Sequence, residues 1–316
     1  MKHYMEMLRD LSEKNGPLCV GLDTDPSYLP ESVLKVFDSP AKAVLAYNKE
    51  IIKRVREAQS ACCFKVQIAY YEAMGIDGLK AYIETVRAVK EAGFVVISDI
   101  KRGDIADTAK AYARAHFSGD FETDIITVNP YMGFDTLKPF TEYCKPLTPQ
   151  SEVKTGSKGI FVLLRTSNPG MTDIEQQELK AGGRVLDKTG AELTRISEEF
   201  KQIYPEQSCS PVGAVVGCTE ESDARAIRDA YPDIFFLIPG YGAQGGAARI
   251  AATLLDKAGG TVNSSRGILC AWKKDPELAS QRETGSLCLK DIADSAGRAC
   301  DAAKKDLLAA KKELGI

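Results

Sequence analysis

Three charged residues that could act together follow one another at the end of an apolar run. In FVVISDIKRGDIADT (94–108), the carboxylates of Asp99 and Asp104 flank the ammonium group of Lys101. Because side chains alternate along a strand, Asp99 and Lys101 share a face with the apolar Ile97. An ammonium group held between carboxylates can donate a proton and stabilise a developing negative charge. A solvated turn with incidental charges is the alternative, but these charges end an otherwise apolar face, which favours a catalytic cluster.

A second lysine is expected in the same layer of the structure. The run CCFKVQ places Lys65 and Gln67 on one face, and a lysine inside a short apolar strand is costly unless it is paired. Asp99 and Asp104 are its candidate partners. The earlier run LCVGLD ends in Asp23, which on its own could equally be the N-cap of the following turn.

Eight short apolar runs, alternating with segments of helical periodicity, must position these side chains. The runs cover residues 18–23, 62–67, 94–101, 124–129, 159–165, 212–217, 235–239 and 266–270, and the helical segments include 41–58, 75–92, 187–203 and 291–313. This alternation predicts a parallel sheet, and eight runs match a closed (β/α)8 TIM barrel, whose catalytic groups lie at the carboxyl ends of the strands. A doubly wound open sheet is the competing architecture, although no GxGxxG follows the first run.

We expect a single domain over residues 1–316, because α/β barrels commonly occupy a chain of this length. The polar, turn-rich segment KPLTPQSEVKTGSKG (145–159) predicts a surface insertion before the fifth strand. A domain linker is the alternative, but a linker there would split the strands into two incomplete sheets.

The composition is that of a soluble globular protein and excludes several classes. A net charge of −3 and a pI near 5.7 argue against nucleic-acid binding. We expect no membrane span and no signal peptide, and hence a cytoplasmic protein. Nine cysteines without a CxxC pair, beside only two histidines, fit a reducing compartment and argue against a Cys/His zinc site, so no metal is expected.

A basic and glycine-rich region follows the last strands. PGYGAQGG comes after the seventh run and before a helix, where backbone N–H groups and a helix terminus suit a phosphate, although such loops often serve only as turns. Arg266 is expected at the start of the eighth strand. The loops after strands seven and eight are the usual phosphate site of a barrel.

The charged segment resembles the signature of a known family. The pattern D-x-K-x-x-D-I-x-x-T, here Asp99, Lys101, Asp104, Ile105 and Thr108, is similar to that of orotidine 5′-phosphate decarboxylases. With Lys65 it resembles that family's Lys-Asp-Lys-Asp network. Further similar segments cover most of the chain: GLDTDP, FKVQIAYYEA, NPYMG, RTSNPG, PGYGAQGG and NSSRGI. The longer spacing and the FKVQIAYYEA and RTSNPG variants resemble the longer, type 2 subfamily.

The resemblance implies decarboxylation of orotidine 5′-phosphate (OMP) to UMP, the last step of pyrimidine biosynthesis, without a cofactor. It implies that Asp99 lies near the departing carboxylate and that Lys101 stabilises the C6 carbanion and protonates it. Lys65 and Asp104 would hold Asp99 and Lys101 in position. The substrate-binding residues that it implies are Asp23, Gln67, Thr108, Thr166, Ser167, Pro239, Gln244 and Arg266. It also implies a homodimer in which Asp104, Ile105 and Thr108 reach into the neighbouring subunit's site.

Two other functions stay open on the sequence. 3-Keto-L-gulonate 6-phosphate decarboxylase and hexulose-phosphate synthase share a similar D-x-K-x-x-D motif but use magnesium, and their second strand carries an acid where this chain has Lys65. A non-catalytic nucleotide-binding barrel belongs to a different class. Turnover of OMP that survives EDTA would separate the cofactor-free enzyme from both.

Overall fold

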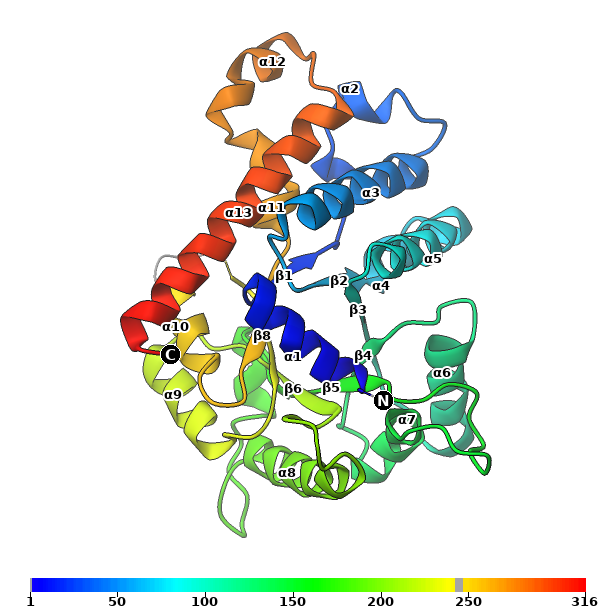
Figure 1. Ribbon diagram of the computed structural model, residues 1–316, viewed down its shortest axis with the longest axis vertical. Coiled ribbons are helices and arrows are strands. Elements are labelled where there is room, and N and C mark those ends of the chain that lie inside the picture. The colour runs from blue at the N-terminus through cyan, green and yellow to red at the C-terminus, as the bar shows by residue number, and fades with distance from the viewer. Residues whose placement is uncertain (1, 242–246) are drawn as a thin grey trace.

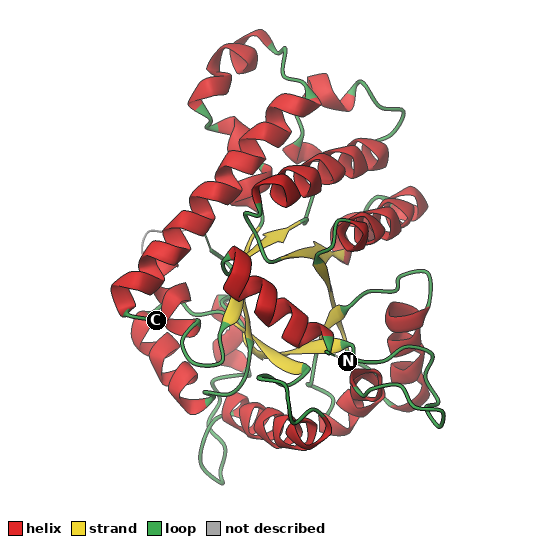
Figure 2. Ribbon diagram, viewed as in Figure 1, coloured by secondary structure: helices red, strands yellow, loops and turns green. Residues whose placement is uncertain are grey.

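Eight parallel strands pair in chain order, and the last pairs with the first, so that the sheet closes into a barrel. The structure, a computed structural model, describes residues 2–241 and 247–316. The strands are β1 (Leu18–Gly21), β2 (Cys63–Gln67), β3 (Val95–Arg102), β4 (Ile125–Val128), β5 (Gly159–Arg165), β6 (Val212–Val216), β7 (Phe236–Ile238) and β8 (Gly260–Ser264). Figure 2 shows these strands at the centre with the helices around them. The predicted TIM barrel is confirmed, and the open sheet is wrong.

Most of the helices surround the barrel, and α1 lies across one end of it. They are α1 (Tyr4–Asn15), α2 (Glu31–Leu34), α3 (Pro40–Ala58), α4 (Ile68–Glu72), α5 (Gly75–Glu91), α6 (Ala106–Ser118), α7 (Lys138–Thr141), α8 (Val185–Ile203), α9 (Glu221–Ala230), α10 (Ala247–Leu254), α11 (Arg266–Leu269), α12 (Ala279–Thr284) and α13 (Leu289–Leu314). The four helical segments predicted from periodicity correspond to α3, α5, α8 and α13. Among the described residues, no helix combines the length and the apolar character that a membrane crossing requires.

The prediction for the eighth strand is wrong. Residues 266–270 form α11 and its end, and the strand is the preceding segment Gly260–Ser264. Its sequence GTVNS lacks an apolar run because two polar side chains face inward: Thr261 contacts the thiol of Cys63, and Asn263 lines the cavity described below. Arg266 consequently follows the carboxyl end of β8, on the catalytic side of a barrel, instead of the amino end of a strand.

The segment 145–159 joins η3 (Glu142–Cys144) to β5 largely as exposed loop, as predicted for a surface insertion. Its last residues are buried, and the ammonium group of Lys158 donates to the carbonyl oxygen of Thr123 at 2.7 Å. The strands on both sides belong to one closed barrel, so the segment does not separate two sheets. That residues 1–316 form a single domain stays a prediction.

Helix α1 closes the amino end of the barrel. It crosses in front of the strands in Figure 1, and its buried Met5 and Leu8 pack against inward side chains such as Val95 and Phe161. His3 caps the helix by accepting from Glu6 N at 3.0 Å. Helix α1 and these inward side chains thus form an apolar floor at the amino end of the barrel, and the carboxyl end is left for polar groups.

If α1 closes the amino end of the barrel, its buried methionine should contribute to the stability of the fold and its exposed methionine should not. Met5 is fully buried and Met7 is 40% exposed. We expect Met5→Ala to lower the free energy of unfolding by about 2–5 kcal/mol, because it leaves a cavity in the core, and Met7→Ala to change it by less than about 0.5 kcal/mol. Urea unfolding of both variants measures this, and equal effects would contradict the assigned role of α1.

Candidate functional site

Four charged side chains of alternating sign meet at the carboxyl ends of β1, β2 and β3. Lys65 Nζ donates to Asp23 Oδ1 at 2.9 Å and to Asp99 Oδ2 at 3.0 Å. Lys101 Nζ donates to Asp99 Oδ1 at 2.6 Å. The predicted Lys65–Asp99 pair is therefore confirmed. Asp23, which on sequence could equally have been an N-cap, is the second partner of Lys65.

The centre of this network is buried, and its two ends are more open. Lys65 is 4% and Asp99 is 6% exposed, whereas the side chain of Lys101 is 45% exposed. Burial alone would raise the pKa of Asp99, but the ammonium groups of Lys65 and Lys101 outweigh it and hold that pKa well below its ordinary value. Burial alone would lower the pKa of Lys65, but Asp99 and Asp23 outweigh it and raise that pKa well above its ordinary value.

These shifts give the pH range in which the network stabilises the fold. The depressed pKa of Asp99 contributes stability above the unfolded value of about 3.9, and this is lost as the pH falls through the folded-state pKa. The raised pKa of Lys65 contributes stability below the unfolded value of about 10.4, and this is lost as the pH rises through the folded-state pKa. Both groups are therefore charged throughout the neutral range.

The backbone of β3 is irregular where the charges lie. The prediction that Asp99 and Lys101 point to the same side is confirmed by their contact, but regular strand alternation does not produce it. Lys101 has a φ of 45°, and the register between β3 and β4 shifts between Ser98 and Arg102. The two side chains meet across this bulge.

A cavity of about 240 Å³ opens above the network. Its lining is charged or polar on the β2–β4 side and apolar on the β5–β7 side, where Leu163, Val215 and Leu237 lie. The lining residues are Lys65, Asp99, Lys101, Thr127, Leu163, Thr166, Ser167, Asn168, Val215, Leu237, Pro239 and Asn263. Six of the predicted site residues thus surround one cavity: Lys65, Asp99, Lys101, Thr166, Ser167 and Pro239. A flat organic ring with a charged substituent suits such a two-sided space.

Close packing of three strand ends forms one wall of the cavity. A Cβ atom added at Gly217 would lie 3.1 Å from Ser167 Cβ and 3.2 Å from Pro239 Cγ. Thr166 N and Oγ1 donate to the two carboxylate oxygens of Glu175, at 2.9 and 2.8 Å. This pair of bonds anchors the loop that carries Ser167. Sequence reasoning missed Glu175 because it lies in the loop after β5, outside every recognised motif.

Two further predicted substrate-binding residues, Gln67 at the end of β2 and Arg266 after β8, do not line the cavity. Gln67 Oε1 accepts from Ala69 N at 3.2 Å and caps α4. Arg266 is exposed at the start of α11, and within the described ranges its guanidinium makes no hydrogen bond or ion pair with a side chain. An exposed arginine at the carboxyl end of a barrel strand can bind an anion. Gln244 lies outside the described residues.

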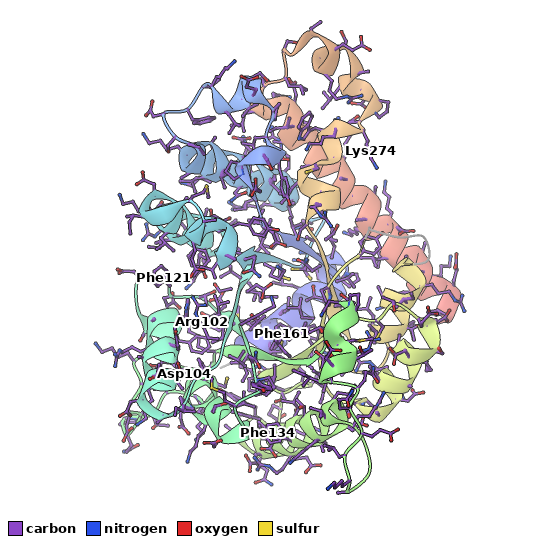
Figure 3. The ribbon with its side chains drawn as sticks, turned by 180° about the vertical axis from the view of Figure 1, so that it is seen from behind. Arg102, Asp104, Phe121, Phe134, Phe161 and Lys274 are labelled. Carbon is purple, nitrogen blue, oxygen red and sulfur yellow. The ribbon has the colours of Figure 1, made fainter. Side chains whose placement is uncertain are left out.

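Asp104 and Thr108 do not join the network of their own chain. Asp104 Oδ1 accepts from Ile105 N at 2.8 Å, and Thr108 is exposed on the first turn of α6. Figure 3 shows Asp104 beside α6, apart from Phe161 at the barrel centre. Ile105 is 57% exposed, and Tyr131, in the adjacent loop after β4, is 75% exposed. An apolar, outward-facing edge therefore flanks Asp104.

Two further polar residues, Asn263 and Ser265, belong to the site although sequence reasoning did not single them out. Ser265 Oγ donates to Asp23 Oδ2 at 2.6 Å and accepts from Asn263 Nδ2 at 3.1 Å. These bonds connect β8 to the free oxygen of Asp23. The eighth strand was predicted at residues 266–270, after Asn263 and Ser265, so these two residues were not treated as strand-end side chains.

The carboxylates of this site are committed to ammonium groups, which leaves little room for a divalent cation. A magnesium ion held by Asp23 and Asp99 would have to displace Lys65. Over residues 2–241 and 247–316, one group of three potential metal ligands lies close together, His3, Glu6 and Cys209, beneath the barrel floor. Those atoms already bond to one another and to backbone, for example Cys209 Sγ to Glu6 Oε2 at 3.2 Å.

Comparison with known proteins gives a consistent result. Residues 16–282 match the family model described as Orotidine 5′-phosphate decarboxylase / HUMPS family. A protein of Clostridium botulinum (strain Langeland) named orotidine 5′-phosphate decarboxylase is 48% identical over 274 residues, 86% of this chain and 91% of the relative. The structure of Leishmania donovani OMP decarboxylase is similar with a TM-score of 0.65 and 28% identity, over 96% of this chain and 99% of that one. A Plasmodium berghei orotidine 5′-monophosphate decarboxylase, 17% identical, has the same fold with a TM-score of 0.76 over 99% of this chain and all of that one.

Removing the central ammonium group should expose how much the network depends on it. We expect Lys65→Met to lower the free energy of unfolding at pH 7 by about 3–5 kcal/mol, because it leaves buried carboxylates with one fewer cation. Lys80→Met, which breaks an exposed pair with Asp77, should change it by less than about 0.5 kcal/mol.

The same pair of variants gives a pH test. Without Lys65 the pKa of Asp99 rises toward or above its unfolded value, so the destabilisation should shrink as the pH falls from 7 toward 3. Urea unfolding across this range measures it. A destabilisation that stays constant with pH would show that Lys65 acts through packing and not through charge.

Proposed function

This chain belongs to the orotidine 5′-phosphate decarboxylase family, and on that premise we propose how it converts OMP to UMP. The observation that carries the proposal is the alternating network of Asp23, Lys65, Asp99 and Lys101 at one side of a cavity whose other wall is apolar. The pyrimidine ring occupies this cavity with its C6 carboxylate directed toward Asp99 and Lys101.

Decarboxylation breaks the bond between C6 and its carboxylate, releases CO2 and leaves the electron pair on C6. Lys101 stabilises this carbanion and donates the proton that completes UMP, and it then regains a proton from solvent. Asp99 lies against the departing carboxylate. Two like charges about 4 Å apart repel each other by roughly 4 kcal/mol at an effective dielectric of about 20. Relief of this repulsion would accelerate the reaction by close to a thousandfold, so stabilisation of the carbanion must supply the remaining rate enhancement.

Lys65 keeps Asp99 ionised and in place during this reaction. Its ammonium group binds the carboxylate oxygen opposite to the one that Lys101 binds. Asp23, which shares Lys65, lies at the end of β1, where it and Gln67 are placed to address the base and the ribose. No step of this scheme passes through a metal ion or an organic cofactor.

The remaining contacts follow from the loops around the mouth. Ser167, on the loop held by Glu175, contacts the pyrimidine, and Thr166 lies beside it. Arg266 binds the phosphate bidentately from the end of β8, and Pro239 shapes the loop after β7. Gln244 completes the phosphate site in this proposal.

The superfamily alternative is a magnesium-dependent sugar-phosphate enzyme. It is disfavoured because Lys65 occupies the carboxylate oxygens that would bind the ion. A non-catalytic nucleotide-binding barrel is separated by assay alone, since it would bind UMP and leave OMP unchanged.

We propose that the functional unit is a homodimer with shared active sites. The support is the exposed apolar edge at Ile105 and Tyr131, with Asp104 and Thr108 unpaired with the charges of their own chain. In this arrangement Asp104 of one subunit supplies a carboxylate to Lys101 of the other. We also propose a cytoplasmic location, since all nine cysteines are free thiols, as a reducing compartment favours.

The proposed function is tested by the loss of ultraviolet absorbance when OMP is added. Turnover should persist in EDTA, and Lys101→Ala should reduce kcat by at least about a thousandfold while UMP still binds, because the proton donor is lost and the cavity is retained. Lys201→Ala, an exposed lysine of α8, is the matched control and should turn over normally. Near-normal kcat in Lys101→Ala would overturn the mechanism, and UMP binding without turnover in the unmodified protein would overturn the function.

Shared sites predict complementation between two inactive variants. Mixing Lys101→Ala with Asp104→Ala should restore up to about a quarter of the activity of the unmodified dimer. Random exchange makes about half of the dimers mixed, and one of the two sites in each mixed dimer has both residues intact. Subunit exchange is verified separately by pairing tagged and untagged chains. Exchange without any recovery of activity would show that Asp104 serves its own chain.

A further inference from the structure

A buried threonine of β4 lies directly opposite the bulge that carries the proposed catalytic lysine. Thr127 is 1% exposed, and its hydroxyl oxygen accepts from Ile100 N at 3.0 Å and from Lys101 N at 2.9 Å. The same hydroxyl donates to Asp99 Oδ1 at 2.9 Å. One side chain therefore bonds to the backbone of Lys101 and to the carboxylate that binds the Lys101 side chain.

The bulge creates the need for such a group. Ser98 pairs with Ile126 and Arg102 with Val128, so β3 advances four residues while β4 advances two. The extra residues place Lys101 in a left-handed conformation, which is unfavourable for a residue other than glycine. The N–H groups of Ile100 and Lys101 do not pair with the β4 backbone, and a buried N–H group without an acceptor is costly.

The direction of each bond follows from the chemistry of a hydroxyl group. A threonine hydroxyl has one proton to donate and two lone pairs. Both lone pairs of Thr127 face backbone N–H groups, so its proton points to Asp99. Asp99 Oδ1 consequently accepts from Thr127 and Lys101, and Oδ2 accepts from Lys65.

We infer that Thr127 is a positioning residue for the reaction, a role that rests on the proposed function. It holds the left-handed backbone of Lys101 and the carboxylate of Asp99 at a constant separation, so that Lys101 Nζ points into the cavity toward C6. The β-branched side chain suits this task because it has few accessible χ1 rotamers. A valine has nearly the same shape and can make none of the three hydrogen bonds.

The test compares Thr127→Val with Thr127→Ser and with a matched buried threonine. Thr261 is fully buried on β8, where its hydroxyl donates to Pro17 O at 3.0 Å on the floor side of the barrel, so Thr261→Val removes a comparable bond outside the site. We expect Thr127→Val to lower kcat by about 10- to 100-fold with KM for OMP within about threefold, since misplacement of a reacting group acts on the chemical step. Thr127→Ser and Thr261→Val should keep kcat within about threefold of the unmodified protein.

A second measurement isolates the proton transfer. The exchange of the C6 hydrogen of UMP for deuterium in D2O can be followed by NMR. In the proposed mechanism this exchange uses Lys101 but does not involve decarboxylation. It should slow in Thr127→Val in parallel with kcat and be unchanged in Thr261→Val. A thermal unfolding midpoint lowered equally in both valine variants, with only Thr127→Val losing turnover, would separate positioning from general stability.

Two outcomes would overturn the inference: normal kcat in a folded Thr127→Val, or a loss in Thr127→Ser as large as in Thr127→Val. Should Thr127→Val fail to fold, Thr127→Ala removes the same hydroxyl without placing a methyl group against the backbone, and the same criteria apply to it. Failure of the proposed function is distinguishable, because the unmodified protein would then leave OMP unchanged. The separation of Lys101 Nζ from Asp99 Oδ1 in a crystal structure of the folded variant would still test the positioning role.

Discussion

A buried ammonium group is the constraint around which this site is built. Lys65 stands in the middle of a short strand with 4% exposure, and a charge so placed is tolerated only when partners neutralise it. Asp23 and Asp99 supply two negative charges, and Lys101 returns the total of the four to zero. The buried pair of Lys65 and Asp99 thus lies within a group of four whose net charge is zero, whereas any three of these groups would leave an uncompensated charge.

The barrel separates the part that provides stability from the part that performs chemistry. Beneath the network, α1 and the inward apolar side chains of β2 to β7 bury the lower interior, and the Met5 side of α1 is fully enclosed. Above it, the backbone is irregular and polar groups replace apolar ones. The left-handed conformation at Lys101 is unfavourable in isolation. It persists because Thr127 satisfies the backbone N–H groups that the bulge leaves unpaired.

Sequence patterns predicted the parts of this structure in which local sequence decides the outcome. Seven strands were recognisable because each buries a continuous apolar run, and Lys65 and Asp99 were recognisable because charges interrupt such runs. β8 was not, since GTVNS turns polar side chains inward and carries no such run. The bulge depends on how β3 pairs with β4, which is a tertiary property, so neither the geometry of Lys101 nor the role of Thr127 could be read from residues 94–108 alone. Asp23 was ambiguous for a related reason, because its partner Lys65 lies on another strand.

The hydrogen-bonding capacity of Lys101 bears on why one chain does not complete the proposed site. An ammonium group has three N–H donors, and among the described residues Asp99 Oδ1 is the acceptor of one of them. The side chain is 45% exposed, so two donors face open space. One direction leads into the cavity, where the C6 carbon of the substrate is proposed to lie. The other is free for the carboxylate of a second subunit, which in this proposal pairs with the ammonium group of Lys101 and brings the net charge of the group from zero to −1. The position of Asp104 outside the network of its own chain and the unused N–H donors of Lys101 are therefore two consequences of one proposed arrangement.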